Sequence, residues 1–346
     1  MKAAVYFEYG PPDVVHIRDV EKPVPKDDEV LINVRAASVN PVDRIFRGTP
    51  YLIRILSGLR KPKDIRMGRD LAGRVEAVGR NVTQFKPGDE VFGLGLGAFA
   101  EFVCASEAAM VMKPENVTFE QAASVPVAAL TALQGLRNKG QIHAGQKVLI
   151  NGAAGGVGTF TVQIARSFGA DVTGVCSTRN VEMVRSIGAD RVIDYTQEDF
   201  TRGTQRYDLI FDCVGNHSLS ACRRVLNPYG ICVLAGGPVT VLGVLTRALG
   251  ALMLSRFVSQ NFVMFLARRS KEDLNILRDL MAAGKVTPVI DRRYALRDVP
   301  QAIRYLEEGH ARGKIVITLE SNHNGGGGIP GWEPTPPHPR AAKEEQ

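Results

Sequence analysis

The chain has 346 residues, of which 45% are hydrophobic and 23% are charged, and its formal net charge at pH 7 is +7. This apolar content supports packed cores and excludes a disordered chain, while the length predicts two domains. The basic residues are spread along the chain, with local clusters at 60–63 and 268–271. That distribution favours a solvated surface or a field that attracts an anionic cofactor, and we expect no nucleic-acid partner.

The N-terminal part, up to about residue 122, is rich in strand-like sequence. Its first residues enter such sequence directly, without the basic segment and long apolar stretch of a signal peptide, so we expect a cytoplasmic location. Residues 30–34 follow the pattern of a strand, and a turn at 86–89 leads into another strand at 90–93. These features predict a compact β-rich domain.

From about residue 123 to residue 289 the pattern changes, and short apolar strands alternate with helical segments. The strand candidates are 147–150, 171–175, 191–193, 207–211 and 231–234. Alternation of this kind predicts βα units in a parallel, doubly wound sheet.

The segment from 239 to 266 is strongly apolar. Arg247 and Arg256 interrupt it, and no uncharged run in it reaches the length of about 18 residues that a membrane span requires. We therefore expect no transmembrane segment. A buried helix, a lid, a dimer surface and peripheral membrane contact are all left open.

A helical stretch near 298–308 and a last strand at 314–319 follow. Beyond them, residues 321–346 contain four consecutive glycines and five prolines and lack apolar periodicity. This composition predicts a disordered tail.

The cysteines and histidines give no sign of a metal site. The five cysteines are scattered without C-x-x-C spacing, which argues against a disulfide framework and against a cysteine zinc site. The six histidines also lack ligand spacing. We therefore predict buried free thiols and no bound metal.

The strongest chemical signal is the glycine-rich loop at 151–158, which follows an apolar strand and precedes a predicted helix at 159–168. It is an A-x-G-x-x-G variant of the dinucleotide-binding fingerprint. Glycine at 155 lets the backbone approach a pyrophosphate, glycine at 158 lets helix and strand pack closely, and the helix start offers amides to the phosphates. The predicted contacts are Ala154, Gly155, Gly156, Val157 and Gly158.

The end of the next strand indicates which dinucleotide is bound. An NAD enzyme usually carries an acid there to hold the ribose hydroxyls, but this chain has Ser177 and Arg179 instead. Both side chains, with Tyr195 as a third contact, suit a 2′-phosphate. We therefore predict NADPH as the cofactor, the alternative being that Arg179 only caps an exposed helix start.

Several motifs spread over residues 1 to about 320 resemble the medium-chain dehydrogenase/reductase superfamily. They are the segments 37–43, 68–75, 85–91, 153–158 and 312–316. The resemblance implies an α/β protein with a GroES-like β-rich domain, formed by residues 1–122 with 290–320, and a Rossmann doubly wound parallel-sheet domain at 123–289. The active site would lie in the cleft between them.

Zinc alcohol dehydrogenases of this superfamily have a cysteine where this chain has Asn40 and a His-Glu pair where it has Arg69 and Asp70. The four-cysteine structural zinc lobe is also missing, since residues 81–122 contain only Cys104. The chain is therefore similar to the zinc-free quinone oxidoreductase-like branch, whose members reduce quinones or activated double bonds.

The resemblance also suggests site residues. It places Asn40 and Thr131 beside the nicotinamide and ribose, and it adds Val214, Gly236 and Gly237 to the cofactor contacts. Asn40 would also donate a hydrogen bond to the substrate oxygen. Asp43 is a candidate for a proton relay or a ribose contact, with a helix cap as the alternative, and Tyr51 is a candidate for a hydroxyl that faces the substrate.

The sequence thus predicts an NADPH-dependent oxidoreductase that transfers hydride to an apolar quinone or another conjugated carbonyl. An enone or enoyl reductase and an NADP-dependent alcohol dehydrogenase-like enzyme are the alternatives within the enzyme class. A non-catalytic NADPH-binding protein is the second class. A homo-oligomer is left open.

Overall fold

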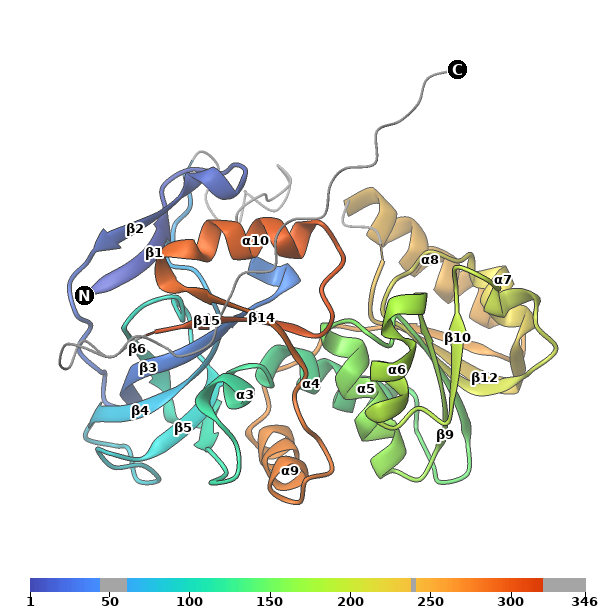
Figure 1. Cartoon of the computed structure of the whole chain (residues 1–346), viewed down its shortest axis with the longest axis horizontal. Coiled ribbons are helices and arrows are strands. Elements are labelled where there is room, and N and C mark those ends of the chain that lie inside the picture. Colours follow the sequence, from blue (N-terminus) through green and yellow to red (C-terminus); the bar gives the residue numbers. More distant parts are fainter. Residues whose placement is uncertain (44–60, 238–240, 320–346) are drawn as a thin grey trace.

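The computed structural model describes residues 1–43, 61–237 and 241–319. Figure 1 shows two lobes side by side, one rich in strands and carrying the N-terminus, the other a sheet covered by helices. The predicted disordered tail and Tyr51 lie outside the described residues.

The β-rich lobe is built around a long central strand, β3, which pairs with β4, β6 and β15. The sheet runs in the order β14-β15-β3-β4-β5-β7, and β1 and β2 form a separate antiparallel pair. The strands are β1 (Lys2–Tyr6), β2 (Val15–Asp19), β3 (Glu29–Val39), β4 (Asp70–Val78), β5 (Glu90–Leu94), β6 (Phe102–Ser106), β7 (Met110–Met112), β14 (Ile290–Ala295) and β15 (Lys314–Thr318).

Chain segments far apart in sequence meet in this sheet. β15 pairs antiparallel with β3, with Ile315 opposite Val39, so the end of the described chain completes the sheet begun by the N-terminal part. The domain boundaries themselves stay a prediction.

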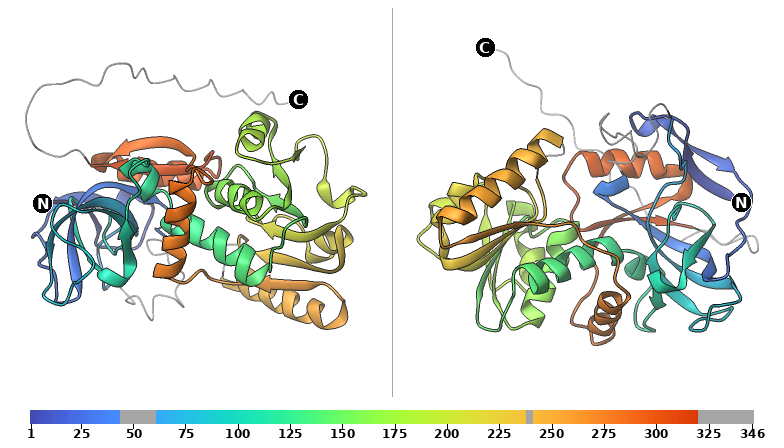
Figure 2. Two further views of the ribbon diagram at one scale, coloured as in Figure 1. Left: turned by 90° about the horizontal axis from the view of Figure 1, so that it is seen from below. Right: turned by 180° about the vertical axis from the view of Figure 1, so that it is seen from behind.

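The second sheet has six parallel strands in the order β10-β9-β8-β11-β12-β13. They are β8 (Lys147–Asn151), β9 (Asp171–Cys176), β10 (Arg191–Asp194), β11 (Tyr207–Asp212), β12 (Leu226–Leu234) and β13 (Asn261–Met264). The order reverses direction between β8 and β11, and helices cover both faces of the sheet (Figure 2). The predicted GroES-like lobe and Rossmann sheet are therefore both confirmed.

The described α-helices are α3 (Phe119–Ala123), α4 (Pro126–Gln134), α5 (Gly156–Ser167), α6 (Val181–Ser186), α7 (Leu219–Arg224), α8 (Val241–Phe257), α9 (Lys271–Ala282) and α10 (Val299–Glu307). The two helices predicted with bounds, at 159–168 and 298–308, correspond to α5 and α10. Helix α5 begins three residues earlier than expected, inside the glycine-rich loop. This shift brings the helix start to the residues predicted to bind phosphate.

The apolar segment at 239–266 contains α8 and the edge strand β13, and one face of α8 is exposed, so of the alternatives left open a fully buried helix does not apply. Leu245, Leu249, Leu252, Met253 and Phe257 are each between 48% and 79% exposed. Their spacing places them along one helical face. Figure 2 shows α8 at the outer surface of its lobe, and no helix among the described residues is long and apolar enough to cross a membrane.

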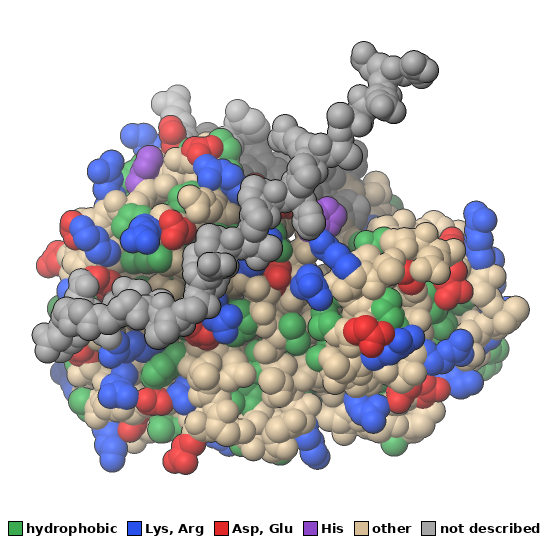
Figure 3. Space-filling model, viewed as in Figure 1, with side chains coloured by type: hydrophobic (Ala, Val, Ile, Leu, Met, Phe, Trp, Pro, Cys, Tyr) green, Lys and Arg blue, Asp and Glu red, His purple; other side chains and the backbone are tan. Residues whose placement is uncertain are grey.

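Charges are interspersed on the molecular surface. On the face shown in Figure 3, lysines and arginines are scattered over both lobes among acidic side chains.

All five cysteines are free, and Cys176, Cys222 and Cys232 are buried, as predicted for packing residues.

Candidate cofactor and active site

The glycine-rich loop joins β8 to α5. Gly152 has φ +85°, a left-handed conformation that favours glycine, and Gly155 is the N-cap of α5. A Cβ on Gly158 would lie 2.0 Å from the carbonyl oxygen of Gly152, so the close helix–strand packing predicted at this position is present.

Gly155 and Gly156 serve a different purpose. A Cβ on either would meet no described atom closer than 3.3 Å, so packing within the protein does not require glycine there. Among the described residues, no side chain caps α5. The helix start therefore has no described side chain bonded to its first amides, and their partial positive charge suits a pyrophosphate.

The carboxyl ends of β8 and β11 form the point where the strand order reverses. Asp212, at the end of β11, is 1% exposed and accepts hydrogen bonds through Oδ1 from Asn151 Nδ2 and from the backbone amides of Val214 and Gly215. Its Oδ2 lies 2.7 Å from Arg247 Nη2, which belongs to α8. These bonds fix the backbone conformation at Val214, whose side chain is 45% exposed.

Neither Asp212 nor Arg247 was predicted as a site residue. An acid at the end of a predicted strand was visible in the sequence, but its arginine partner lies 35 residues further along the chain. Only the packing of α8 against the sheet brings them together.

Gly236 and Gly237 follow β12. A Cβ on Gly236 would lie 1.9 Å from the carbonyl oxygen of Cys213, so glycine is required by the approach of two protein segments. The predicted contact of Gly236 and Gly237 with the cofactor stays a prediction.

The predicted 2′-phosphate residues lie at the ends of β9 and β10. Tyr195 is 59% exposed, and Ser177 Oγ accepts a hydrogen bond from Asn180. Arg179 Nη2 donates to the carbonyl of His310, and Arg312 Nη2 donates to the carbonyl of Arg179. Arg312, which sequence reasoning assigned only to a family motif, thus contacts the backbone of Arg179.

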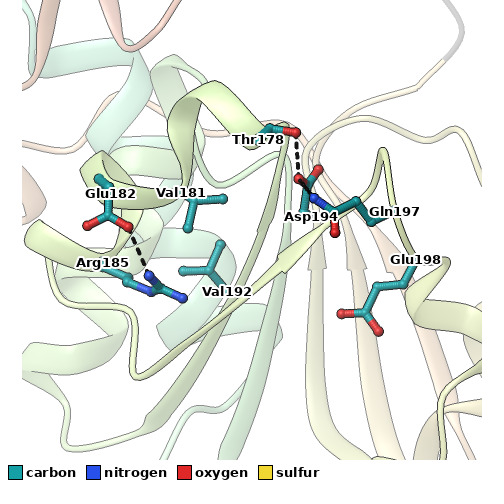
Figure 4. Close-up of a pocket in the computed structure, with 8 residues that line it drawn as sticks. All are labelled: Thr178, Val181, Glu182, Arg185, Val192, Asp194, Gln197 and Glu198. Carbon is teal, nitrogen blue, oxygen red and sulfur yellow. Dashed lines mark hydrogen bonds and ion pairs between the residues drawn. The ribbon is translucent and has the colours of Figure 1, made fainter.

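A hollow of about 630 Å³ lies nearby, between α6 and β10 (Figure 4). Its lining side chains are mixed in charge, and Thr178 Oγ1 donates to Asp194 at its rim. All its lining residues fall within 178–198, so it includes neither the glycine-rich loop nor any part of the β-rich lobe. The hollow therefore does not define the reaction site.

A cluster of buried polar side chains lies at one end of the β-rich sheet. Strand pairing sets Ser38 of β3 opposite Asp70 of β4, while β15 starts at Lys314 on the other side of β3. Asn40 follows β3 directly. Ser38, Asn40, Asp70 and Lys314 are all at most 3% exposed.

Asn40 is held by both ends of its amide. Its Nδ2 donates to Asp70 Oδ2 at 2.9 Å and to the carbonyl of Ser38 at 3.2 Å, and its Oδ1 accepts from Lys314 Nζ at 2.6 Å. Both amide hydrogens are thus used within the protein, and a bond to a substrate oxygen would require one of them to be released. The catalytic role of Asn40 stays a prediction.

Asp70 connects this cluster to the helix that joins the lobes. Its Oδ1 accepts the backbone amide of Val127 in the first turn of α4, and its Oδ2 lies 3.7 Å from Lys314 Nζ. Burial raises the pKa of Asp70 and lowers that of Lys314, and their mutual attraction opposes both shifts. Hydrogen-bond donors surround the Asp70 carboxylate and favour its ionised form.

Asp43 lies against the same cluster. Its Oδ2 accepts the backbone amide of Asn40 at 2.8 Å, and residues 41–43 are helical, so the side chain caps a helix start. Burial raises the pKa of Asp43 to about 7. Thr131, by contrast, donates its hydroxyl to Val127 within α4, and its cofactor contact stays a prediction.

No group of three or more His, Cys, Asp or Glu side chains is placed to hold a metal ion in the part of the chain that the structure describes. The positions of the expected zinc ligands instead hold Asn40 and Arg69. The metal-free nature of the protein stays a prediction.

A GroES-like lobe, a Rossmann sheet and a glycine-lined helix start at the strand reversal define a two-lobed oxidoreductase. Residues 26–115 match the alcohol dehydrogenase GroES-like domain, and residues 187–317 match the zinc-binding dehydrogenase family. The chain belongs to the medium-chain dehydrogenase/reductase superfamily, in its quinone oxidoreductase-like branch.

Three known proteins illustrate the similarity. The 2-methylene-furan-3-one reductase of Solanum lycopersicum and the chloroplastic NADPH-dependent alkenal/one oxidoreductase of Arabidopsis thaliana are each 34% identical, over 92% of this chain and 79% of theirs. The solved quinone oxidoreductase of Coxiella burnetii is 31% identical, with a TM-score of 0.81 over 92% of this chain and 99% of that one.

Proposed function

We propose that this protein is an NADPH-dependent reductase that transfers hydride to a quinone or another conjugated carbonyl. The observation that carries the proposal is the position of the glycine-lined start of α5 next to Lys314 of the Asn40 cluster. A dinucleotide whose pyrophosphate lies on the helix start can then extend toward both Arg179 and Asn40. The relatives named above reduce related acceptors, or use NADPH, according to their names.

The chain contributes orientation and charge at named positions. Amides of Gly156 and Val157 would hold the pyrophosphate, and Arg179 and Arg312, with Ser177 and Tyr195, would hold the 2′-phosphate. When bound, NADPH supplies the hydride. A conjugated acceptor spreads the arriving charge over its own oxygen, so the protein has mainly to position the reactants and exclude water.

The direct test is oxidation of NADPH, followed by the loss of its near-ultraviolet absorbance. We expect turnover with 1,4-benzoquinone or a simple enone that exceeds turnover with an unconjugated aldehyde, and slower reaction with NADH. Saturable NADPH binding without turnover of any acceptor would contradict the proposal and favour a binding-only protein. Prior dialysis against a strong chelator should leave the rate unchanged, whereas loss that zinc restores would overturn the metal-free prediction.

We propose a flat, apolar acceptor as the substrate, with an unsaturated ketone as the alternative. The supporting feature is the apolar character of the segments at 51–63 and 239–266, the first of which lies mostly outside the described residues. Comparing kcat/KM for quinones of increasing ring number with that for chain-lengthened enones would separate the two.

We also propose a homo-oligomer that forms through α8 and β13. Within the described residues β13 pairs only with β12, so it is the open edge of the sheet, and α8, which carries the exposed apolar face, packs against β13. A second copy related by a two-fold axis would cover both features at once.

A cytoplasmic location also stays a proposal, because one relative is chloroplastic, and fractionation of the source cells would test it.

A further inference from the structure

The short segment from His310 to Lys314 contacts residues of the predicted cofactor site along its length. At one end, the carbonyl of His310 accepts from Arg179. In the middle, Gly313 forms a β-bridge with Gly155 of the glycine-rich loop. At the other end, a Cβ on Gly156 would lie 3.3 Å from Lys314 Cδ, so the stem of this lysine lies against the start of α5.

The ammonium group of Lys314 reaches the Asn40 cluster. Nζ lies 2.6 Å from Asn40 Oδ1, 3.4 Å from the carbonyl of Val39 and 3.7 Å from Asp70 Oδ2, and the side chain is only 3% exposed. One side chain thus contacts both the predicted pyrophosphate loop and the residue that follows β3. Lys314 itself is the first residue of β15 and belongs to neither segment.

A buried ammonium is costly, and a buried ion pair is weak evidence for stability, because apolar residues of similar size often stabilise as well. An apolar side chain at this position could not fix the orientation of the Asn40 amide. A cation must face Asn40 Oδ1 and a carboxylate must face Nδ2, so Lys314 and Asp70 together allow one orientation of the amide. Without Lys314, Asn40 Oδ1 would lose its donor and Asp70 its counter-ion.

We propose that Lys314 is a positioning residue for hydride transfer, which holds Asn40 in one orientation relative to the glycine-rich loop. The proposal rests on the proposed function and names a residue that sets its geometry. Lys314 acts through Asn40 and through the stem contact at Gly156, and its ammonium donors are used within the protein. Its loss should therefore affect the reacting geometry more than the affinity for NADPH.

The test compares Lys314→Met with Lys113→Met. Lys113 is a matched control in the same lobe: its side chain is 6% exposed, and its Nζ lies 3.2 Å from Glu90 Oε2 and donates to the carbonyls of Pro114 and Val117. Each substitution removes one buried ammonium and keeps an apolar stem. Only Lys314 lies beside the glycine-rich loop.

We expect Lys314→Met to lower kcat by about 10- to 100-fold and to increase the primary isotope effect with deuterated NADPH, with a smaller change in the NADPH dissociation constant. Lys113→Met should lower the melting temperature without these changes. Lys314→Arg, which keeps the charge and donors, should recover part of kcat. In an Asn40→Ala background, Lys314→Met should cause little further loss, because the two act as a unit.

The outcome that overturns the proposal is a Lys314→Met protein that loses stability as Lys113→Met does but keeps kcat and the isotope effect. If Lys314→Met does not fold, Lys314→Gln, which can still donate one hydrogen bond, is measured in the same way. The fluorescence of bound NADPH gives a readout that is independent of turnover: we expect the substitution to change it, and an unchanged emission would overturn the proposal. Absence of acceptor reduction by the unsubstituted protein would instead contradict the proposed function, and absence of NADPH binding would contradict both.

Discussion

Asp43 shows how a buried carboxyl can be read in two ways. The sequence suggested a proton relay or a helix cap, and its bond to the backbone amide of Asn40 supports the cap. The two roles differ in the protonation state they need. A pH-dependent measurement can therefore address both.

Replacing Asp43 with asparagine should flatten the pH dependence of stability. Burial raises the pKa of Asp43 from 3.8 to about 7, so the folded protein holds this proton more tightly than the unfolded chain does. Stability should then fall as pH rises from about 4 through about 7, and Asp43→Asn, which keeps an oxygen acceptor for the cap, should lose this slope. Thermal unfolding across this pH range measures the difference.

The control is Asp19→Asn. Asp19 is exposed, and its hydrogen bond with Lys2 holds the pKa of its carboxyl below the usual value, so this substitution should not change the slope above pH 5. Parallel curves for the unsubstituted protein and Asp43→Asn would show that Asp43 is already ionised. A fall in kcat of Asp43→Asn, without a change in stability, would favour the relay.

For single residues, the sequence predicted those that belong to local motifs and missed those whose position depends on strand register. The phosphate loop could be found because its glycines lie within eight residues. Lys314 and Asn40 are 274 positions apart and meet only because β15 pairs with β3. No local pattern carries that information, so Lys314 was visible only as part of a family motif.

At the level of the elements, glycine has two different roles at the start of α5: close packing at Gly158 and predicted contact with the cofactor at Gly155. Gly158→Ala would place Cβ 2.0 Å from a backbone oxygen, which cannot move aside cheaply, so we expect a loss of stability of about 1–3 kcal/mol or more and loss of NADPH binding. Gly155→Ala meets its nearest described atom at 3.4 Å, so it should fold nearly as well yet bind NADPH more weakly. Denaturant unfolding and NADPH titration of both variants test this contrast, which equal stability losses would contradict.

The exposed face of α8 makes a prediction about assembly. Leu249 is 61% exposed and lies in the middle of the apolar face, so Leu249→Lys should shift a homo-oligomer toward monomer. Light scattering coupled to size exclusion gives the mass. Val24→Lys, at an 83% exposed site in the other lobe, should leave the mass unchanged. If Leu249→Lys has the mass of the unsubstituted protein, α8 does not form the interface.

Five strands of the Rossmann sheet were predictable because buried parallel strands are short, continuous apolar runs. The edge strand β13 was missed, because it lies inside the longer apolar segment at 239–266. The exposure of α8 was not predictable either, because an apolar run without clear periodicity does not show which face is covered.

For the whole molecule, the important feature is that each lobe contributes residues to the predicted cofactor site. The pairing of β15 with β3 carries residues 310–314 from the β-rich lobe to the end of β9 and the start of α5. Composition and strand rhythm indicated two domains. The return of the C-terminal part to the first sheet followed only from the family resemblance, because sequence spacing cannot show which sheet a strand joins.

This arrangement predicts that the 2′-phosphate is held from both lobes. Arg179→Ala should raise KM for NADPH by about 10- to 100-fold, as expected for a lost charged hydrogen bond, with little effect on KM for NADH. Arg312→Ala should act in the same direction, and the double variant should show coupling, because Arg312 donates to the carbonyl of Arg179. Steady-state kinetics with both cofactors measure this. If Arg179→Ala weakens NADPH and NADH equally, the basic pair does not bind the phosphate and instead holds the lobes together through the carbonyls of His310 and Arg179.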